Sequence, residues 1–190
     1  MDLYLGGKRA LVTGASKGIG AAIAETLAGE GCDLHLAARN GGALESHARK
    51  LREEHGVAVT VHAVDLRVAA DLERLTEATG DADIVVNSAG DIPAGTLEDV
   101  GSEFWRHAWN LEVFGYIDLV RCVYPRFRAR GHGVIVNVIG TGGAGNAALM
   151  AFIKALGGEG PRHGVRVVGV NPGPVATERV TTMRAAKRRR

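Results

Sequence analysis

Short apolar segments alternate with segments of helical periodicity along most of the chain, and this alternation constrains the fold more than any other feature. Apolar runs typical of buried parallel strands lie at residues 10–12, 33–38, 57–64, 83–87, 134–139 and 165–170. Helical spacing occurs at residues 19–27, 44–54, 71–78, 102–129 and 147–156. Because strand–helix–strand units join parallel strands through right-handed crossovers, the pattern predicts one doubly wound α/β domain over residues 1–190, with a parallel sheet between two layers of helices.

The composition excludes several classes of protein. A formal net charge of +2 gives no general basis for nucleic-acid binding, and we expect the basic end, Lys187 to Arg190, to be solvated. No apolar run reaches the roughly 18 residues of a membrane span, and no basic-then-apolar leader precedes the first strand. Cys32 and Cys122 lie in apolar stretches without metal-ligand spacing, which indicates buried reduced thiols and no metal site. These features predict a soluble cytoplasmic protein.

A glycine-rich turn follows the first apolar run and opens the first helical segment, reading Thr13-Gly14-Ala15-Ser16-Lys17-Gly18-Ile19-Gly20. Glycines let the backbone turn sharply and approach a ligand without an obstructing Cβ. The free N–H groups and the dipole at the start of a helix favour a pyrophosphate there. Between the first strand and first helix of an alternating chain, the turn predicts a dinucleotide site, with a purely structural turn as the alternative.

Four further motifs follow in order along the chain. They are Asp65-Leu66 after the third strand, Asn87-Ser88-Ala89-Gly90 after the fourth, Asn110 in the long helix, and Asn171-Pro172-Gly173-Pro174-Val175-Ala176-Thr177 after the sixth. Together with the glycine-rich turn, this set resembles the short-chain dehydrogenase/reductase family over nearly the whole chain. The resemblance implies a Rossmann-type fold and a ligand site outside the carboxyl ends of the strands.

The resemblance also implies a role for each motif. Asp65 would accept a hydrogen bond from the adenine amino group, and a simple helix N-cap is its alternative role. Ala89 and Gly90 would line the adenosine ribose. The Pro172 segment would hold the nicotinamide or be only a turn. The implied cofactor-binding residues are Gly14, Ser16, Lys17, Gly18, Ile19, Gly20, Arg39, Asn40, Asp65, Leu66, Asn87, Ala89, Gly90, Pro172, Gly173, Val175 and Thr177.

The end of the second predicted strand indicates which nicotinamide nucleotide the chain prefers. NAD-binding proteins of this fold carry a carboxylate there, which pairs with the ribose 2′-hydroxyl and repels a 2′-phosphate. Ala38 takes that place here, Arg39 follows it, and Lys17 lies in the glycine-rich turn. Two cations without an acid favour a phosphate, so we expect NADP(H) as the preferred cofactor, with NAD(H) as the alternative.

The residues that perform the family's hydride chemistry are not matched. The family uses a tyrosine as acid and base, a lysine four residues later that lowers the tyrosine pKa, and a serine after the fifth strand. Gly140 stands at the serine position, with Thr141 a weak substitute, Gly142 at the tyrosine position and Asn146 at the lysine position. Either the chain lacks this segment, or the sequence omits residues between Thr141 and Asn146. We favour the omission, because the family's final helices and last strand are also not found before Arg190.

Two functions therefore fit the sequence. The first is an NADP(H)-dependent oxidoreductase that transfers a hydride between the nicotinamide and a small keto or hydroxy compound. Asn110 is then the visible catalytic candidate, because the family holds a proton-relay water at this asparagine; a helix kink is its alternative role. The second is a non-catalytic NADP(H)-binding protein that acts as a sensor or an assembly partner.

The long helix at residues 102–129 carries more apolar side chains than one buried stripe requires. We expect a homo-oligomer, a dimer or a tetramer, assembled through this helix. A loop of the same chain that covers the helix is the alternative. The side chains concerned are Phe104, Trp105, Ala108, Trp109, Leu111, Val113, Phe114, Ile117, Leu119, Val120 and Val123.

Overall fold

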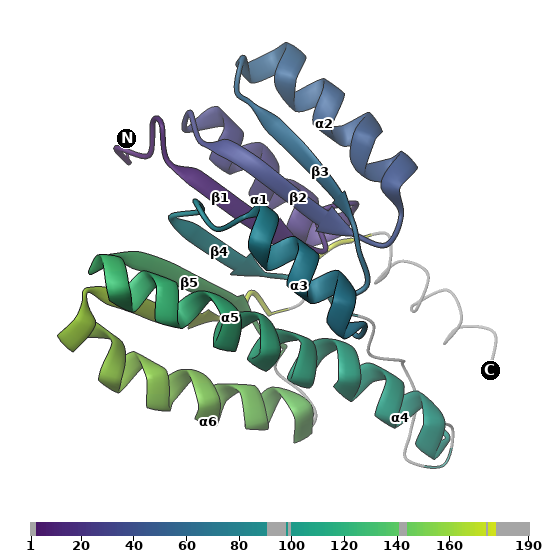
Figure 1. Ribbon diagram of the computed structural model, residues 1–190. Helices are drawn as coiled ribbons and strands as arrows, with labels where there is room; N and C mark the ends of the chain where they lie inside the picture. The colour runs from purple at the N-terminus through teal and green to yellow at the C-terminus, as the bar shows by residue number, and fades with distance from the viewer. Residues whose placement is uncertain (1–2, 91–97, 99, 141–143, 174, 178–190) are drawn as a thin grey trace.

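A single parallel sheet of six strands organises the described part of the chain, residues 3–90, 98, 100–140, 144–173 and 175–177 of the computed structural model (Figure 1). The strand order is β3-β2-β1-β4-β5-β6. β1 pairs with β2 on one side and with β4 on the other, so the winding direction reverses there. This doubly wound topology confirms the predicted fold class. The strands are β1 Arg9–Thr13, β2 Asp33–Ala38, β3 Val59–Ala63, β4 Ile84–Asn87, β5 Gly133–Val138 and β6 Val165–Val170.

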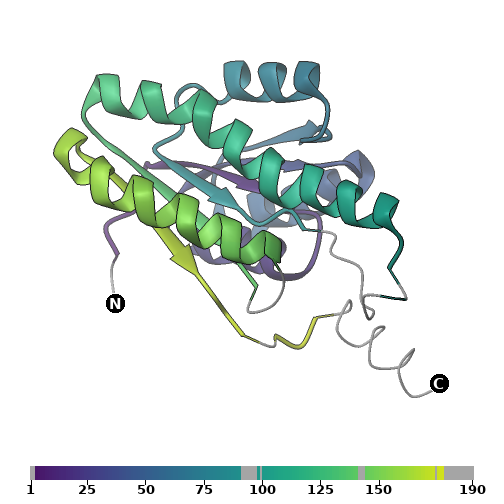
Figure 2. The same cartoon turned by 90° about the horizontal axis from the view of Figure 1, so that it is seen from below.

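Helices cover both faces of the sheet (Figures 1 and 2). Side chains alternate between the faces along each strand, so Ala10 and Val12 join the core under α1 and α2, whereas Leu11 joins the core under α3, α5 and α6. Both faces are therefore apolar, as the continuous apolar runs of the sequence predict. The helices are α1 Gly18–Gly29, α2 Gly41–His55, α3 Ala69–Ala78, α4 Ser102–Trp109, α5 Gly115–Arg130 and α6 Ala144–Glu159.

The bounds of the elements follow the sequence pattern closely. β2 and β6 have the predicted bounds, Asp33–Ala38 and Val165–Val170. α2 begins three residues before the predicted start, because the side chain of Asn40 accepts a hydrogen bond from the N–H of Ala43 at 3.0 Å and caps the helix. A cap of this kind extends a helix beyond its apolar stripe.

The long helix predicted at residues 102–129 contains an irregular turn. α4 ends at Trp109, a π-helical turn spans Asn110–Phe114, and α5 continues from Gly115. The N–H of Gly115 donates to the carbonyl of Asn110, five residues earlier, where an α-helix would use the residue four earlier. The turn therefore holds one extra residue and changes which side chains face the sheet.

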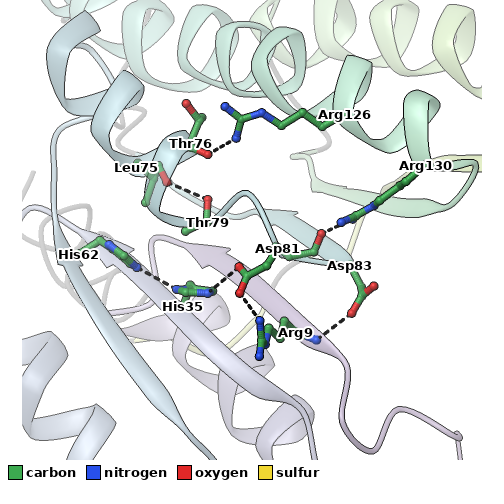
Figure 3. A network of polar contacts seen from close by, with 11 residues as sticks. Arg9, His35, His62, Leu75, Thr76, Thr79, Asp81, Asp83, Arg126 and Arg130 are labelled. Carbon is green, nitrogen blue, oxygen red and sulfur yellow. Dashed lines mark hydrogen bonds and ion pairs between the residues drawn. The ribbon is translucent and has the colours of Figure 1, made fainter.

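A polar network joins the amino-terminal part of the sheet (Figure 3). Arg9 forms an ion pair with Asp81, and the backbone N–H of Arg9 donates to Asp83 Oδ2 at 3.1 Å. Asp81 Oδ1 lies 3.4 Å from His35 Nε2, and His35 Nδ1 lies 3.0 Å from His62 Nε2. The network thus links β1, β2 and β3 to the loop that precedes β4.

The structure bears on two predictions made from the composition, the absence of a membrane span and the state of the two cysteines. Among them, no helix has the length and apolar character that crossing a lipid bilayer requires. Cys32 and Cys122 are both free thiols, but only Cys32 is fully buried, and Cys122 is half-buried. The prediction of a solvated basic end concerns residues 187–190, which lie outside the described residues.

Candidate functional site

A cavity of about 630 Å³ opens at the carboxyl ends of the strands, where open α/β sheets bind their ligands. Fifteen of the seventeen predicted cofactor residues line it, and the other two, Asn87 and Val175, do not. The lining predicted residues are Gly14, Ser16, Lys17, Gly18, Ile19, Gly20, Arg39, Asn40, Asp65, Leu66, Ala89, Gly90, Pro172, Gly173 and Thr177.

Two positions of the glycine-rich turn, Gly14 and Gly20, have no room for any residue other than glycine. Gly14 has a φ of 68°, in the left-handed region, and a Cβ there would lie 2.7 Å from the carbonyl oxygen of Ser88. A Cβ on Gly20 would collide with the carbonyl of Gly14. Lys17 stands at the N-cap of α1 and its side chain does not cap the helix. The first N–H groups of α1 therefore face the cavity without a side-chain acceptor, as an anion site requires.

The hydroxyl of Thr13 fixes the loop after β4 against this turn. Its Oγ1 accepts hydrogen bonds from the backbone N–H groups of Ser88 at 3.1 Å and Ala89 at 3.3 Å. It donates in turn to the carbonyl of Val86 at 3.3 Å. Thr13 is fully buried, so it positions the wall of the cavity without touching its contents.

Asn87, which was predicted to bind the cofactor, is instead part of the interior of the sheet. Its side chain is fully buried, and Nδ2 donates to Asn137 Oδ1 at 2.9 Å. Asn137 Nδ2 lies 3.4 Å from the carbonyl of Val168. The two amides therefore bridge β4, β5 and β6, and Asn87 is not among the residues that line the cavity.

Cations flank the cavity at the ends of β1 and β2. Lys17 and Arg39 are exposed and line the wall, and Ala38 occupies the position of the acid found in NAD-binding proteins. Asn40 also lines the wall, although its carbonyl oxygen Oδ1 is used to cap α2. The β2 end of the cavity is therefore positively charged.

Asp65 lies at the end of β3 in contact with Arg67. Arg67 Nε donates to Asp65 Oδ1 at 2.8 Å, and a second guanidinium nitrogen binds Oδ2. Hydrogen bonding by Arg67 holds the pKa of the Asp65 carboxyl below its ordinary value, against the opposing effect of burial. The alternative role of Asp65 as a helix N-cap is wrong, because Val68 occupies the N-cap of α3.

The segment after β6 is both a turn and part of the wall. Asn171 Oδ1 accepts from the N–H of Gly173 at 3.1 Å, and Gly173 has a φ of 65°. Pro172, Gly173 and Thr177 line the cavity. Val175 instead lines an apolar hollow on α1, together with Ile19, Ala22, Ile23, Thr26, Leu27, Ala176 and others.

The catalytic candidate Asn110 is exposed and does not line the cavity. It is the first residue of the π-helical turn, which agrees with its alternative role as a helix kink. Leu111, Glu112 and Tyr116 line the cavity in its place. Sequence reasoning missed Glu112, because apolar periodicity carries no signal for a π-helical turn.

The residues at the family's catalytic positions contact one another. Asn146 is buried, and its Oδ1 accepts a hydrogen bond from the backbone N–H of Gly140 at 2.7 Å.

Burial, with a smaller contribution from the charge of Glu112, raises the pKa of Tyr116 well above its ordinary value. A tyrosine that acts as acid and base needs the opposite shift. Gly142 lies outside the described residues.

Comparisons with known proteins identify the family. The family model for short chain dehydrogenase matches residues 8–188. An uncharacterized oxidoreductase of Staphylococcus saprophyticus is 31% identical, over 90% of this chain and 79% of its own length. L-Sorbose reductase from Gluconobacter frateurii, complexed with NADPH and L-sorbose, superposes with a TM-score of 0.90 at 35% identity, over 98% of this chain and 78% of that one. A short-chain dehydrogenase from Sphingobium yanoikuyae in complex with NADPH superposes with a TM-score of 0.85 at 33% identity, over 90% and 73%. This chain belongs to the short-chain dehydrogenase family of oxidoreductases.

Proposed function

We propose that this protein is an NADP(H)-dependent oxidoreductase that transfers a hydride between the nicotinamide and a small keto or hydroxy compound. The observation that carries the proposal is the cavity at the carboxyl ends of the strands, with the start of α1 and two cations on its wall. Membership of an oxidoreductase family supports the reaction class.

The residues on the wall fit a dinucleotide in an extended pose. The turn from Gly14 to Gly20 would hold the pyrophosphate, because no side-chain cap occupies the start of α1 and a Cβ on Gly14 or Gly20 would collide with backbone. Asp65 and Leu66 would hold the adenine, and the segment from Pro172 to Thr177 the nicotinamide. When bound, the nicotinamide supplies or accepts the hydride, and the chain supplies orientation and charge.

The charges at the β2 end support NADP(H) over NAD(H). Arg39 and Lys17 offer a guanidinium and an ammonium group to a 2′-phosphate, and Ala38 offers no acid to a 2′-hydroxyl. NADPH is also the nucleotide in the L-sorbose reductase and Sphingobium structures.

Arg39→Gln tests the cofactor assignment. We expect about tenfold weaker binding of NADPH, because a charge-assisted hydrogen bond to the phosphate is lost, and little change for NADH. Fluorescence titration with each reduced nucleotide measures both affinities. Arg49→Gln, an exposed arginine on α2 away from the cavity, is the matched control and should change neither. Equal losses of NADPH and NADH affinity in Arg39→Gln would contradict the assignment.

A non-catalytic NADP(H)-binding protein remains the second candidate. The contact between Asn146 and Gly140 favours it, because these two of the three family positions for catalysis hold groups that bind each other. A protein that binds NADPH but oxidises none of it with a broad carbonyl panel would support this candidate over the first.

Assembly through the long helix and a cytoplasmic location belong to the same proposal. Phe104, Trp105 and Phe114 are 63%, 37% and 50% exposed, which leaves an apolar surface on α4 and the π-helical turn. Most of the remaining apolar side chains of the helix are buried within the chain itself. The interface would therefore centre on these three aromatic residues, and sedimentation velocity measures the oligomeric state.

A further inference from the structure

Arg67 is a charged residue beside the cavity that the proposed function leaves without a role. It follows β3, its side chain is 19% exposed, and it is not among the described residues that line the cavity. Its Nε donates to Asp65 Oδ1 at 2.8 Å, its Nη2 binds Asp65 Oδ2, and its backbone N–H donates to Oδ1 at 3.1 Å. Its Nη1 contacts the imidazole of His107 on α4. Arg67 is therefore held against Asp65, which does line the cavity.

The strand register places Asp65 beside the proposed site of the 2′-phosphate. Ala38 of β2 pairs with Ala63 of β3. Arg39 and Asp65 follow this pair closely, so they leave the sheet at neighbouring strand ends, and both line the cavity. Hydrogen bonding by Arg67, and to a smaller extent the charge of Arg39, hold the pKa of the Asp65 carboxyl below its ordinary value. Asp65 is therefore ionised at neutral pH and close enough to Arg39 to sense its charge.

An unbalanced carboxylate at this place would oppose the binding of NADP(H). A phosphate group carries about two negative charges at neutral pH, and an acid at the end of the second strand repels it in proteins of this fold that prefer NAD. Asp65 stands at the end of the adjacent strand, so its charge acts on the phosphate in the same sense. The guanidinium of Arg67 balances that charge where the carboxylate stands.

We propose, as an extension that rests on the proposed function, that Arg67 sets the preference for NADP(H) by balancing the charge of Asp65. It is a positioning residue, because it binds the two carboxylate oxygens and removes the repulsion that the acid would exert on the 2′-phosphate. NADH lacks this phosphate, so its affinity does not depend on the balance. The ratio of the two affinities, rather than either affinity alone, therefore reports the role of Arg67.

Arg67→Gln in the full chain tests the inference. Fluorescence titration with NADPH and with NADH gives the ratio of the two affinities. We expect this ratio to fall roughly fivefold, because Asp65 then carries an unbalanced charge beside the phosphate. Damage confined to the adenine pocket would weaken both nucleotides alike. A ratio equal to that of the unaltered protein would therefore overturn the inference.

A second substitution separates charge balance from a direct contact between Arg67 and the phosphate. Asp65→Asn, added to Arg67→Gln, removes the charge of the carboxylate and keeps its shape. The ratio should then return to that of the unaltered protein, even where both affinities fall because adenine has lost its acceptor. A ratio that stays low in the double variant would mean that Arg67 binds the phosphate itself or only maintains the local fold, and the inference would be wrong.

Arg74→Gln is the matched control. Arg74 Nη2 binds Asp71 Oδ1 at 2.8 Å in another arginine–aspartate pair, and neither residue lines the cavity. This variant should keep the ratio of the unaltered protein, and a fall as large as that in Arg67→Gln would contradict the specific role of Arg67. Absence of binding of both nucleotides to the unaltered protein overturns the proposed function. A preference for NADPH that Arg67→Gln leaves intact overturns the inference alone.

Discussion

The amino and carboxyl ends of the parallel sheet are built from different chemical groups. At the amino end, charged side chains such as Arg9 and Asp81 pair with one another, and Arg130 donates to the carbonyl of Ala82 (Figure 3). At the carboxyl end, glycines and backbone amides form much of the cavity wall, and one buried hydroxyl, that of Thr13, positions two of those amides.

This difference indicates where the chain tolerates substitution. The Arg9 and Asp81 side chains are 49% and 46% exposed, so water screens their attraction and the pair contributes little to stability. The carboxyl end depends on groups that no other residue type supplies, namely a glycine in a left-handed conformation and a buried acceptor for two N–H groups. We therefore expect substitutions at the carboxyl end to cost more, although the amino end has the denser network of charges.

The largest difference in stability between the two ends of the sheet should come from adding one methyl group at each end. Gly14→Ala places a Cβ 2.7 Å from the Ser88 oxygen in a left-handed conformation, and should lower the free energy of unfolding by about 3 kcal/mol and abolish NADPH binding. Gly7→Ala, before β1, has a similar φ of 74° but meets nothing within 4 Å, so it should cost only about 1 kcal/mol. Urea unfolding measures both, and equal losses would refute the contrast.

A smaller difference in the free energy of unfolding is expected from removing one hydroxyl group at each end of the sheet. Thr13→Val leaves the N–H groups of Ser88 and Ala89 without their acceptor and should cost about 2 kcal/mol. Thr79→Val, at the amino end, should cost less than about 1 kcal/mol, because the carbonyl of Leu75 keeps its bond from the Thr79 N–H. A larger loss for Thr79→Val in the same urea experiment would reverse our interpretation.

The smallest effect should be a dependence of stability on pH, which arises where His62 of β3 joins the polar network through His35. Burial, and then the charge of His35, lower the pKa of His62 below its ordinary value of 6.5. Below pH 6.5 the unfolded chain therefore binds a proton more readily than the fold does, and stability falls as the pH drops toward the folded pKa. His62→Asn should lose less stability than the unaltered protein between pH 7 and pH 5. Identical losses would exclude this role for His62.

Local signals were sufficient to predict the elements and the position of the cavity. The bounds of β2 follow from the strand-like segment that begins at Asp33 and ends at Ala38. The motifs all follow strands, and parallel strands bring their carboxyl ends to the same edge. Residues as distant as Gly14 and Gly173 consequently line one cavity.

The features that escaped prediction have non-local causes. Asn87 has the appearance of a loop motif, but the register of β4 and β5 places it opposite Asn137, and their side chains bond inside the sheet. Asn110 was chosen from a motif in a regular helix, whereas the π-helical turn brings Glu112 to the wall. The omission predicted between Thr141 and Asn146 falls on residues 141–143, outside the described residues, and stays a prediction.

The π-helical turn between α4 and α5 links the number of residues in this helical segment to the make-up of the cavity wall. A π-helical turn holds one residue more than an α-helical turn, so loss of one residue between Asn110 and Phe114 would leave a regular α-helical turn and reposition the side chains within it. α5 is anchored to the sheet by Leu119 and Val120, both almost fully buried, so the side chains before it would be the ones to turn. A single-codon deletion in this turn would thus change the part of the cavity wall that Leu111 and Glu112 form.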